Sequence, residues 1–151
     1  AKKIYEIGEI PELGTNAKMN EFEAAMGLCM LDDMQSLNVK RKIVYDLYEE
    51  ELERVVNFQE QNKGATQNYS YFPIILESEK QLKKIEKTLN EKDIYPRRYF
   101  YPSLDTLSYV NPPQFCEISR DISSRILCLP IYSELSNKMQ MQIIRLIKQS
   151  L

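Results

Sequence analysis

Apolar and polar positions alternate along this chain in a way that predicts helices joined by short strands. Helices are expected over residues 39–54, 79–93 and 136–149, where apolar side chains recur at helical spacings and share one face. A shorter helix is expected over 119–125. The inward-facing residues are predicted to be Ile43, Val44, Leu47, Tyr48 and Leu52 in the first helix, Leu82, Ile85 and Leu89 in the second, and Met139, Ile143, Ile144 and Ile147 in the last.

Runs rich in aromatic and β-branched residues lie between these helices and predict strands. The strands are expected over 55–59, 69–76, 94–101 and 126–129, with a turn at 61–68. Because Pro73 cannot donate a hydrogen bond to a neighbouring strand, the second strand is expected to be an edge or bulged one. Strands separated by amphipathic helices, with no internal repeat, indicate an α+β fold or an α/β layer.

The stretch GTNAKMNEFEAAMGL, residues 14–28, has a different pattern. Asn20 followed by Glu23 fits a capping box, so a helix is expected to begin at Glu21, after an irregular or extended lead-in over 1–18. This helix is apolar around most of its circumference, and such a helix must be covered on more than one side. The apolar residues are Phe22, Ala24, Ala25, Met26, Leu28, Cys29, Met30 and Leu31.

Length and composition exclude several classes of protein. At 151 residues the chain has one domain's worth of core, and its net charge of -2 gives no basic surface for nucleic acid. The sequence has no apolar run of about 18 residues and no signal-peptide pattern, so we expect a cytoplasmic protein without a membrane span. Cys29, Cys116 and Cys128 lack metal-ligand spacing and are expected to be buried thiols. The absence of histidine removes Ser-His and Cys-His nucleophile pairs and most transition-metal sites.

The segment over 14–28 resembles the signature of the DegT/StrS sugar aminotransferases, which are pyridoxal 5'-phosphate enzymes of the aspartate aminotransferase fold. That signature is Gly-x-Asn-x-Arg-Met, then an acidic residue, Ala-Ala and Gly-Leu. It is matched here by Gly14, Asn16, Met19, Glu21, Ala24, Ala25, Gly27 and Leu28. The resemblance continues in order through Arg41, Tyr48, Leu52 and the stretches 71–74, 95–104 and 129–135, and so covers essentially the whole chain.

The resemblance implies that residues 21–151 are the small C-terminal domain of a fold type I enzyme, with helices packed on a short, mostly antiparallel sheet. Residues 1–20 would be the lead-in from the large domain. In this family the large domain supplies the Schiff-base lysine and most contacts to the cofactor phosphate. We therefore expect the catalytic lysine to lie outside this chain. A reactive lysine must be desolvated or held beside another cation, whereas the lysines here lie mostly in charged helix faces.

Asn16 is the candidate cofactor-binding residue. The resemblance implies that it donates an amide N–H to the cofactor phosphate of the neighbouring subunit in a homodimer, and a loop ahead of a helix suits a phosphate. Alternatively, Asn16 only caps or turns the chain. Lys18 stands where the family usually has arginine. Because lysine lacks the planar fork of arginine, Lys18 is expected to contact a substrate carboxylate or phosphate less rigidly, or to serve only a surface role.

The stretch PRRYFYP, residues 96–102, is the candidate substrate-binding segment. In a strand, Arg97, Tyr99 and Tyr101 would share one face, and Arg98 and Phe100 the other. The arginines could hold the carboxylate of an amino donor or the diphosphate of a sugar nucleotide, with aromatic faces for the sugar. Arg97 aligns with the family's arginine and is the first choice. The alternative is that both arginines extend from a sheet edge and pair with nearby acids.

Residues 102–105 read Pro-Ser-Leu-Asp, whereas many family members carry Pro-Leu-His here, so the substrate pocket is expected to differ. The function implied is amino transfer, from glutamate, to a keto group of a nucleotide-linked sugar, as in the synthesis of cell-surface polysaccharides or deoxyaminosugars. The chain alone should be inactive. Two alternatives stay open: a pyridoxal-dependent sugar dehydratase of the same family, and a ligand-binding or interaction domain without enzyme activity.

Overall fold

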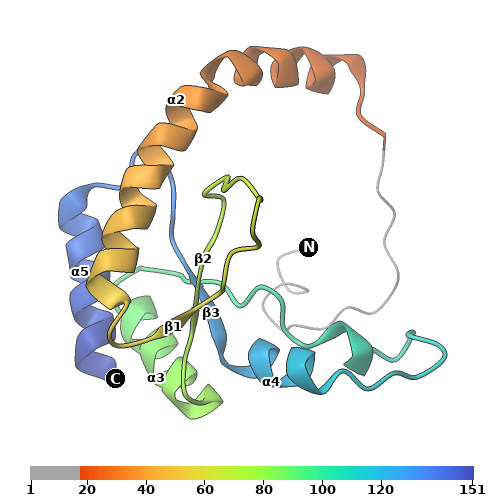
Figure 1. Ribbon diagram of the computed structural model, residues 1–151, viewed down its shortest axis with the longest axis vertical. Helices are drawn as coiled ribbons and strands as arrows, with labels where there is room; N and C mark the ends of the chain where they lie inside the picture. Colours follow the sequence, from red (N-terminus) through yellow and green to blue (C-terminus); the bar gives the residue numbers. More distant parts are fainter. Residues whose placement is uncertain (1–17) are drawn as a thin grey trace.

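The computed structural model of the chain describes residues 18–151. A small antiparallel sheet lies among helices, with the long helix α2 arching over one side (Figure 1). This arrangement confirms the predicted α+β fold with a short antiparallel sheet. The elements are α2 (Glu21–Leu52), β1 (Asn57–Phe58), β2 (Phe72–Ile75), α3 (Glu79–Asn90), a 3-10 turn (Leu104–Thr106), α4 (Glu117–Arg125), β3 (Ile126–Leu129) and α5 (Asn137–Ser150).

The sheet has the order β1-β2-β3, so β2 is its central strand and the prediction of an edge or bulged strand is wrong. Pro73 is tolerated because neither neighbour needs its missing N–H. On one side it pairs with Cys128, whose backbone exchanges both hydrogen bonds with Arg97 instead, at 3.0 and 2.8 Å. On the other side the pairing with β1 stops at Ile74. A proline at this register therefore costs no hydrogen bond of the sheet.

The strand predicted over 94–101 does not form. Arg97 joins the sheet through an isolated antiparallel bridge to Cys128, and the chain then turns at Tyr99 and Phe100. The reason lies in the contacts of Arg98 and Tyr101. The Arg98 side chain bonds to groups at the ends of two helices, and the chain bends so that Tyr101 stacks on its guanidinium. These contacts outweigh the strand preference of an aromatic-rich run.

The hydrophobic core fills the space between β2, β3 and three helices. The alternation of β2 turns Phe72 and Ile74 into this core, together with Leu127 and Leu129 of β3. The C-terminal half of α2, α3 and α5 contribute most of the other buried residues, and α5 packs against both α2 and α3. Most predicted core positions are confirmed, whereas Ile43 and Met139 are exposed because they lie at the margins of their helix stripes.

Helix α2 is one continuous helix of 32 residues rather than the two helices predicted. Its expected start is confirmed, because Asn20 and Glu23 form both hydrogen bonds of the capping box, each at 2.9 Å. The stretch between the two predicted helices contains no Gly or Pro, and polar residues alone do not end a helix. Only the C-terminal half of α2 packs on the core, at Val44, Tyr45, Tyr48 and Leu52.

The N-terminal half of α2 projects away from the sheet (Figure 1). Its apolar side chains are exposed: Phe22 is 85% exposed, Met26 70% and Met30 54%. Cys29 is exposed for the same reason, and Cys116 is exposed just before α4, so the prediction of three buried thiols holds only for Cys128. Within residues 18–151 nothing covers this apolar half of α2, and contiguous exposed apolar surface is typical of an interaction site.

Candidate functional site

The segment that begins at Arg97, the bridge residue, carries an exposed cation beside aromatic rings. Arg97 donates from Nη1 to the Tyr99 hydroxyl at 2.7 Å, and its guanidinium carbon lies 5.8 Å from the centre of that ring. Within residues 18–151 Arg97 has no carboxylate partner. Arg97 is exposed, so its remaining N–H groups can donate hydrogen bonds to an anionic ligand.

Two further aromatic residues contact the Tyr99 ring. The centre of the Tyr71 ring lies 5.4 Å from the centre of the Tyr99 ring, in an edge-on arrangement, and the centre of the tilted Phe100 ring lies 5.2 Å from it. Tyr71, which lies directly before β2, is 55% exposed, and Phe100 is 72% exposed. Tyr71 was not predicted as a site residue, because its contact with Tyr99 joins segments that are distant in sequence. An exposed arginine among aromatic rings suits a ligand that combines negative charge with a ring.

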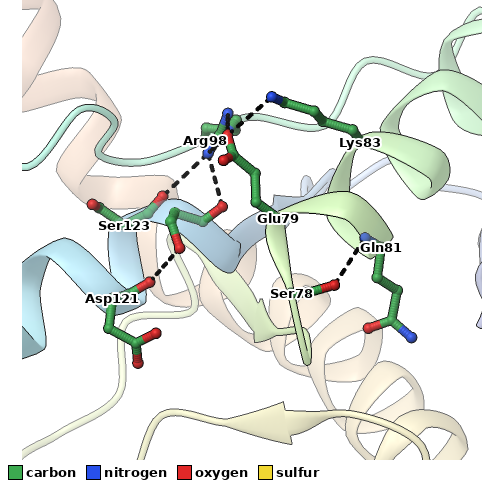
Figure 2. Close-up of polar contacts among 8 residues, drawn as sticks. Ser78, Glu79, Gln81, Lys83, Arg98, Asp121 and Ser123 are labelled. Carbon is green, nitrogen blue, oxygen red and sulfur yellow. Dashed lines mark hydrogen bonds and ion pairs between the residues drawn. The ribbon is translucent and has the colours of Figure 1, made fainter.

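Arg98 lies next in the chain but has a different environment (Figure 2). Its Nη1 and Nη2 both lie 3.3 Å from Oε1 of Glu79, and Nη2 also donates to the Ser124 carbonyl at 2.9 Å. Only 15% of its side chain is exposed. Lys83 and Arg98 together lower the pKa of Glu79, with the Lys83 hydrogen bond as the main cause. Arg98 therefore pairs with a nearby acid, as the alternative for this stretch expected.

Tyr101 is separated from Arg97 and Tyr99 by the same arrangement. The guanidinium carbon of Arg98 lies 3.6 Å from the centre of the Tyr101 ring, so that one face of the ring is occupied. The predicted common face of Arg97, Tyr99 and Tyr101 does not exist, because the segment is a turn and not a strand. Arg97 and Tyr99 are brought together, whereas Tyr101 packs with Arg98.

Asp105 organises the neighbouring loop. It accepts hydrogen bonds from the Ser103 hydroxyl, from the Cys116 backbone at 2.9 Å, and from Nε of Arg120 at 2.7 Å. These donors, led by Ser103, lower the pKa of Asp105 to about 2. The departure from Pro-Leu-His thus has a structural use here: Asp105 fixes the approach to α4. Sequence reasoning missed this role, because no local spacing links Asp105 to Arg120.

The lysines among residues 18–151 do not have the surroundings expected of a Schiff-base lysine. Every lysine among residues 18–151 is exposed, whereas a lysine that reacts with an aldehyde must be available as the free amine. Lys42 shows the opposite tendency, because its hydrogen bond to Asp46 raises its pKa. The N-terminus of α2 is a poor phosphate site, since its own Asn20 caps it and Glu21 and Glu23 add negative charge.

The two remaining predicted site residues are Lys18 and Asn16. Lys18 is exposed and precedes the N-terminal end of α2, the end that projects from the rest of the fold (Figure 1). It forms no ion pair within residues 18–151. Asn16 lies outside the described residues. In the part of the chain that the structure covers, no cluster of three or more metal-ligating residues occurs, and no helix has the length and apolarity needed to span a membrane.

Comparison with known proteins agrees with this fold. Solved aminotransferases share it: the aminotransferase TlmJ from Streptoalloteichus hindustanus superposes with a TM-score of 0.79 at 17% identity, over 94% of this chain and 39% of that one. A DegT DnrJ EryC1 StrS aminotransferase from Brucella abortus gives a TM-score of 0.76 at 22% identity, over 98% of this chain and 42% of that one.

Sequence relatives have related activities. A dTDP-4-amino-4,6-dideoxy-D-glucose transaminase from Shigella dysenteriae is 33% identical over 91% of this chain. A GDP-perosamine synthase from Escherichia coli O157:H7 is 25% identical over 83% of it. The chain spans 39% and 35% of the lengths of these two relatives. The sequence pattern of the DegT/DnrJ/EryC1/StrS aminotransferase family matches residues 2–148, and this chain therefore belongs to that family.

Proposed function

We propose that this chain is the C-terminal small domain of a pyridoxal phosphate-dependent transaminase that moves an amino group from glutamate to a keto group of a nucleotide-linked sugar. Family membership and the names of its relatives support the reaction class. Pyridoxal phosphate supplies an electron sink for such chemistry. The described lysines are exposed, and Lys2 and Lys3 lie outside the described residues. In this proposal the residue that binds the cofactor covalently belongs to a segment outside the chain.

The exposed half of α2 supports the assignment as one domain of a larger protein. Phe22, Met26 and Met30 would be covered in a domain that is complete by itself, and here they are exposed. The chain also spans only about two fifths of the curated relatives. We infer that the large domain of the same enzyme covers this surface. The alternative of an independent interaction domain is less favoured by this exposure.

The role of this chain in the reaction is to form part of the wall that binds the nucleotide sugar. The observation that carries this role is the contrast between the two arginines: Arg98 is occupied within the fold, whereas Arg97 faces solvent without a carboxylate partner in residues 18–151. We assign Arg97 to the diphosphate and Tyr99, with Tyr71, to the sugar or base. Aromatic rings beside the cation favour this ligand over the carboxylate of glutamate.

Three site predictions remain proposals. Tyr101 offers at most one ring face to a substrate, because Arg98 occupies the other. Lys18 would reach a substrate phosphate or carboxylate only if the covering domain brings one to the start of α2. Asn16, outside the described residues, is proposed to contact the cofactor phosphate of the partner subunit in a homodimer.

Two assays test the proposal. The full-length protein, supplied with pyridoxal phosphate and glutamate, should aminate a dTDP-linked keto sugar and release 2-oxoglutarate. The 151-residue chain should do neither, and borohydride treatment with one equivalent of the cofactor should leave no single lysine stoichiometrically modified. A stoichiometric adduct on one particular lysine of this chain would show that the reactive amine lies within it, contrary to the proposal.

A further inference from the structure

Arg98 has a set of contacts that the proposed function does not use. We propose that Arg98 is a positioning residue for the anion-binding surface: it ties the turn over 97–101 to the ends of α3 and α4 and so fixes the direction in which Arg97 and Tyr99 face. The inference rests on the proposed function, because it gives Arg98 a role only if Arg97 binds the nucleotide sugar.

The contacts of Arg98 come from three separate parts of the fold. Glu79, the first residue of α3, approaches from one side, and the carbonyls of Ser123 and Ser124 in the last turn of α4 approach from another, at 3.4 and 2.9 Å (Figure 2). The Tyr101 ring covers the guanidinium face at 3.6 Å. A cation at a helix C-terminus also interacts favourably with the helix dipole, and it donates hydrogen bonds to carbonyls that have no partner within the helix.

The turn is held at two neighbouring residues, whereas Phe100 and Tyr101 are exposed. The backbone of Arg97 is paired with Cys128 of β3, and the side chain of Arg98 is held by the helix ends. The contact between Arg98 and Tyr101 closes the turn across three residues. Within residues 18–151 the Arg97 side chain makes one hydrogen bond, to the Tyr99 hydroxyl. The direction of this side chain therefore depends on Tyr99, which lies in the turn that Arg98 and Tyr101 close.

The contacts require the planar fork of arginine. Both terminal nitrogens reach one Glu79 oxygen while Nη2 also serves the α4 carbonyls and the flat face stacks on Tyr101. A lysine ammonium would keep the charge but could not make these contacts together. Arg98→Lys should thus fold while losing part of the positioning.

The test measures binding of dTDP to the full-length protein by isothermal titration calorimetry, with thermal midpoints recorded alongside. Arg97→Ala and Arg98→Ala should each raise the dissociation constant roughly tenfold, with Arg98→Lys between Arg98→Ala and the wild type. The loss in the double variant should be smaller than the sum of the two single losses, because Arg98 acts mainly through Arg97 and otherwise only through Tyr99.

Arg125→Ala is the matched control. Arg125 is also engaged at the end of α4, with Asp121 and with the Leu76 carbonyl at 2.8 Å, and none of its hydrogen bonds or ion pairs involves residues 97–101. It should lower the thermal midpoint and leave the dissociation constant of dTDP unchanged. An equal loss of dTDP binding in this control would mean that lost stability, and not positioning, explains the Arg98 effect.

The outcomes separate the two proposals. If dTDP does not bind, or if Arg97→Ala binds it as the wild type does, the proposed role of Arg97 is wrong and the inference falls with it. If Arg97→Ala weakens binding while Arg98→Ala and Arg98→Lys do not, only the positioning role is overturned. Additive losses in the double variant, or full binding by Arg98→Lys, would also contradict it.

Discussion

Tyr48 links the buried half of α2 to the chain beyond β3, and removing its hydroxyl gives a stability change that can be worked out from the structure. The side chain is fully buried, its ring packs 5.0 Å from Phe72, and its hydroxyl donates to the Pro130 carbonyl at 3.1 Å. Tyr48→Phe keeps the ring and deletes one hydrogen bond, which should lower the free energy of unfolding by about 1 kcal/mol. The thermal midpoint should fall by roughly 2–4 °C for a chain of this size.

Tyr45→Phe provides the matched comparison for this experiment. Tyr45 lies one turn earlier on α2, is 8% exposed, and packs edge-on against Phe72 at 4.7 Å. Its hydroxyl makes no hydrogen bond within residues 18–151, so the variant should stay within about 0.5 kcal/mol of the wild type. Urea unfolding of the three proteins, with equal m-values, measures both changes. Equal stabilities for the two variants would refute the assigned bond to Pro130.

The same environments predict three further outcomes. Burial raises the pKa of Tyr48 above its ordinary 10.0, so its stabilising contribution is complete below pH 10 and is lost as pH rises further. Between neutral pH and alkali, Tyr48→Phe should therefore lose less stability than the wild type does, as followed by circular dichroism. Equal losses in the two proteins would argue against this burial. The pKa of Asp105 is lowered from 3.8 to about 2, so its contribution is present above about pH 4 and is lost as pH falls toward 2. The stability gap between wild type and Asp105→Asn, measured in urea, should shrink over that interval, and a gap that stays constant would contradict the assigned contacts. In the 151-residue chain, a thiol reagent should modify the exposed Cys29 and Cys116 rapidly and Cys128 slowly, because burial raises the pKa of the Cys128 thiol. Equal rates for all three cysteines would contradict this burial.

Local patterns were sufficient to predict most of the fold. The periodic apolar residues of α3 and α5 and the capping box before α2 each depend on neighbours within one or two turns, and all three elements are confirmed at those positions. The errors arose where distant contacts decide the structure. Pro73 lies in the central strand because Cys128 pairs with Arg97, a relation that no local pattern contains.

The candidate site was predictable only in part for the same reason. The sequence indicated that adjacent arginines near aromatic residues could bind an anion, and it favoured Arg97. Which arginine is free depends on Glu79 and the end of α4, far from both in sequence. The partnership of Tyr71 with Tyr99, and the separation of Tyr101 from both, likewise follow from the turn after Arg97 and not from strand alternation.

The most direct test of the account is a steady-state comparison of the full-length enzyme with its Arg97→Ala and Arg97→Lys variants, using glutamate and a dTDP-linked keto sugar. If Arg97 binds the diphosphate, Arg97→Ala should raise KM for the nucleotide sugar about tenfold or more and leave KM for glutamate unchanged, with Arg97→Lys intermediate. An unchanged KM for the nucleotide sugar, or an increase confined to glutamate, would contradict the assignment of this surface to the sugar nucleotide.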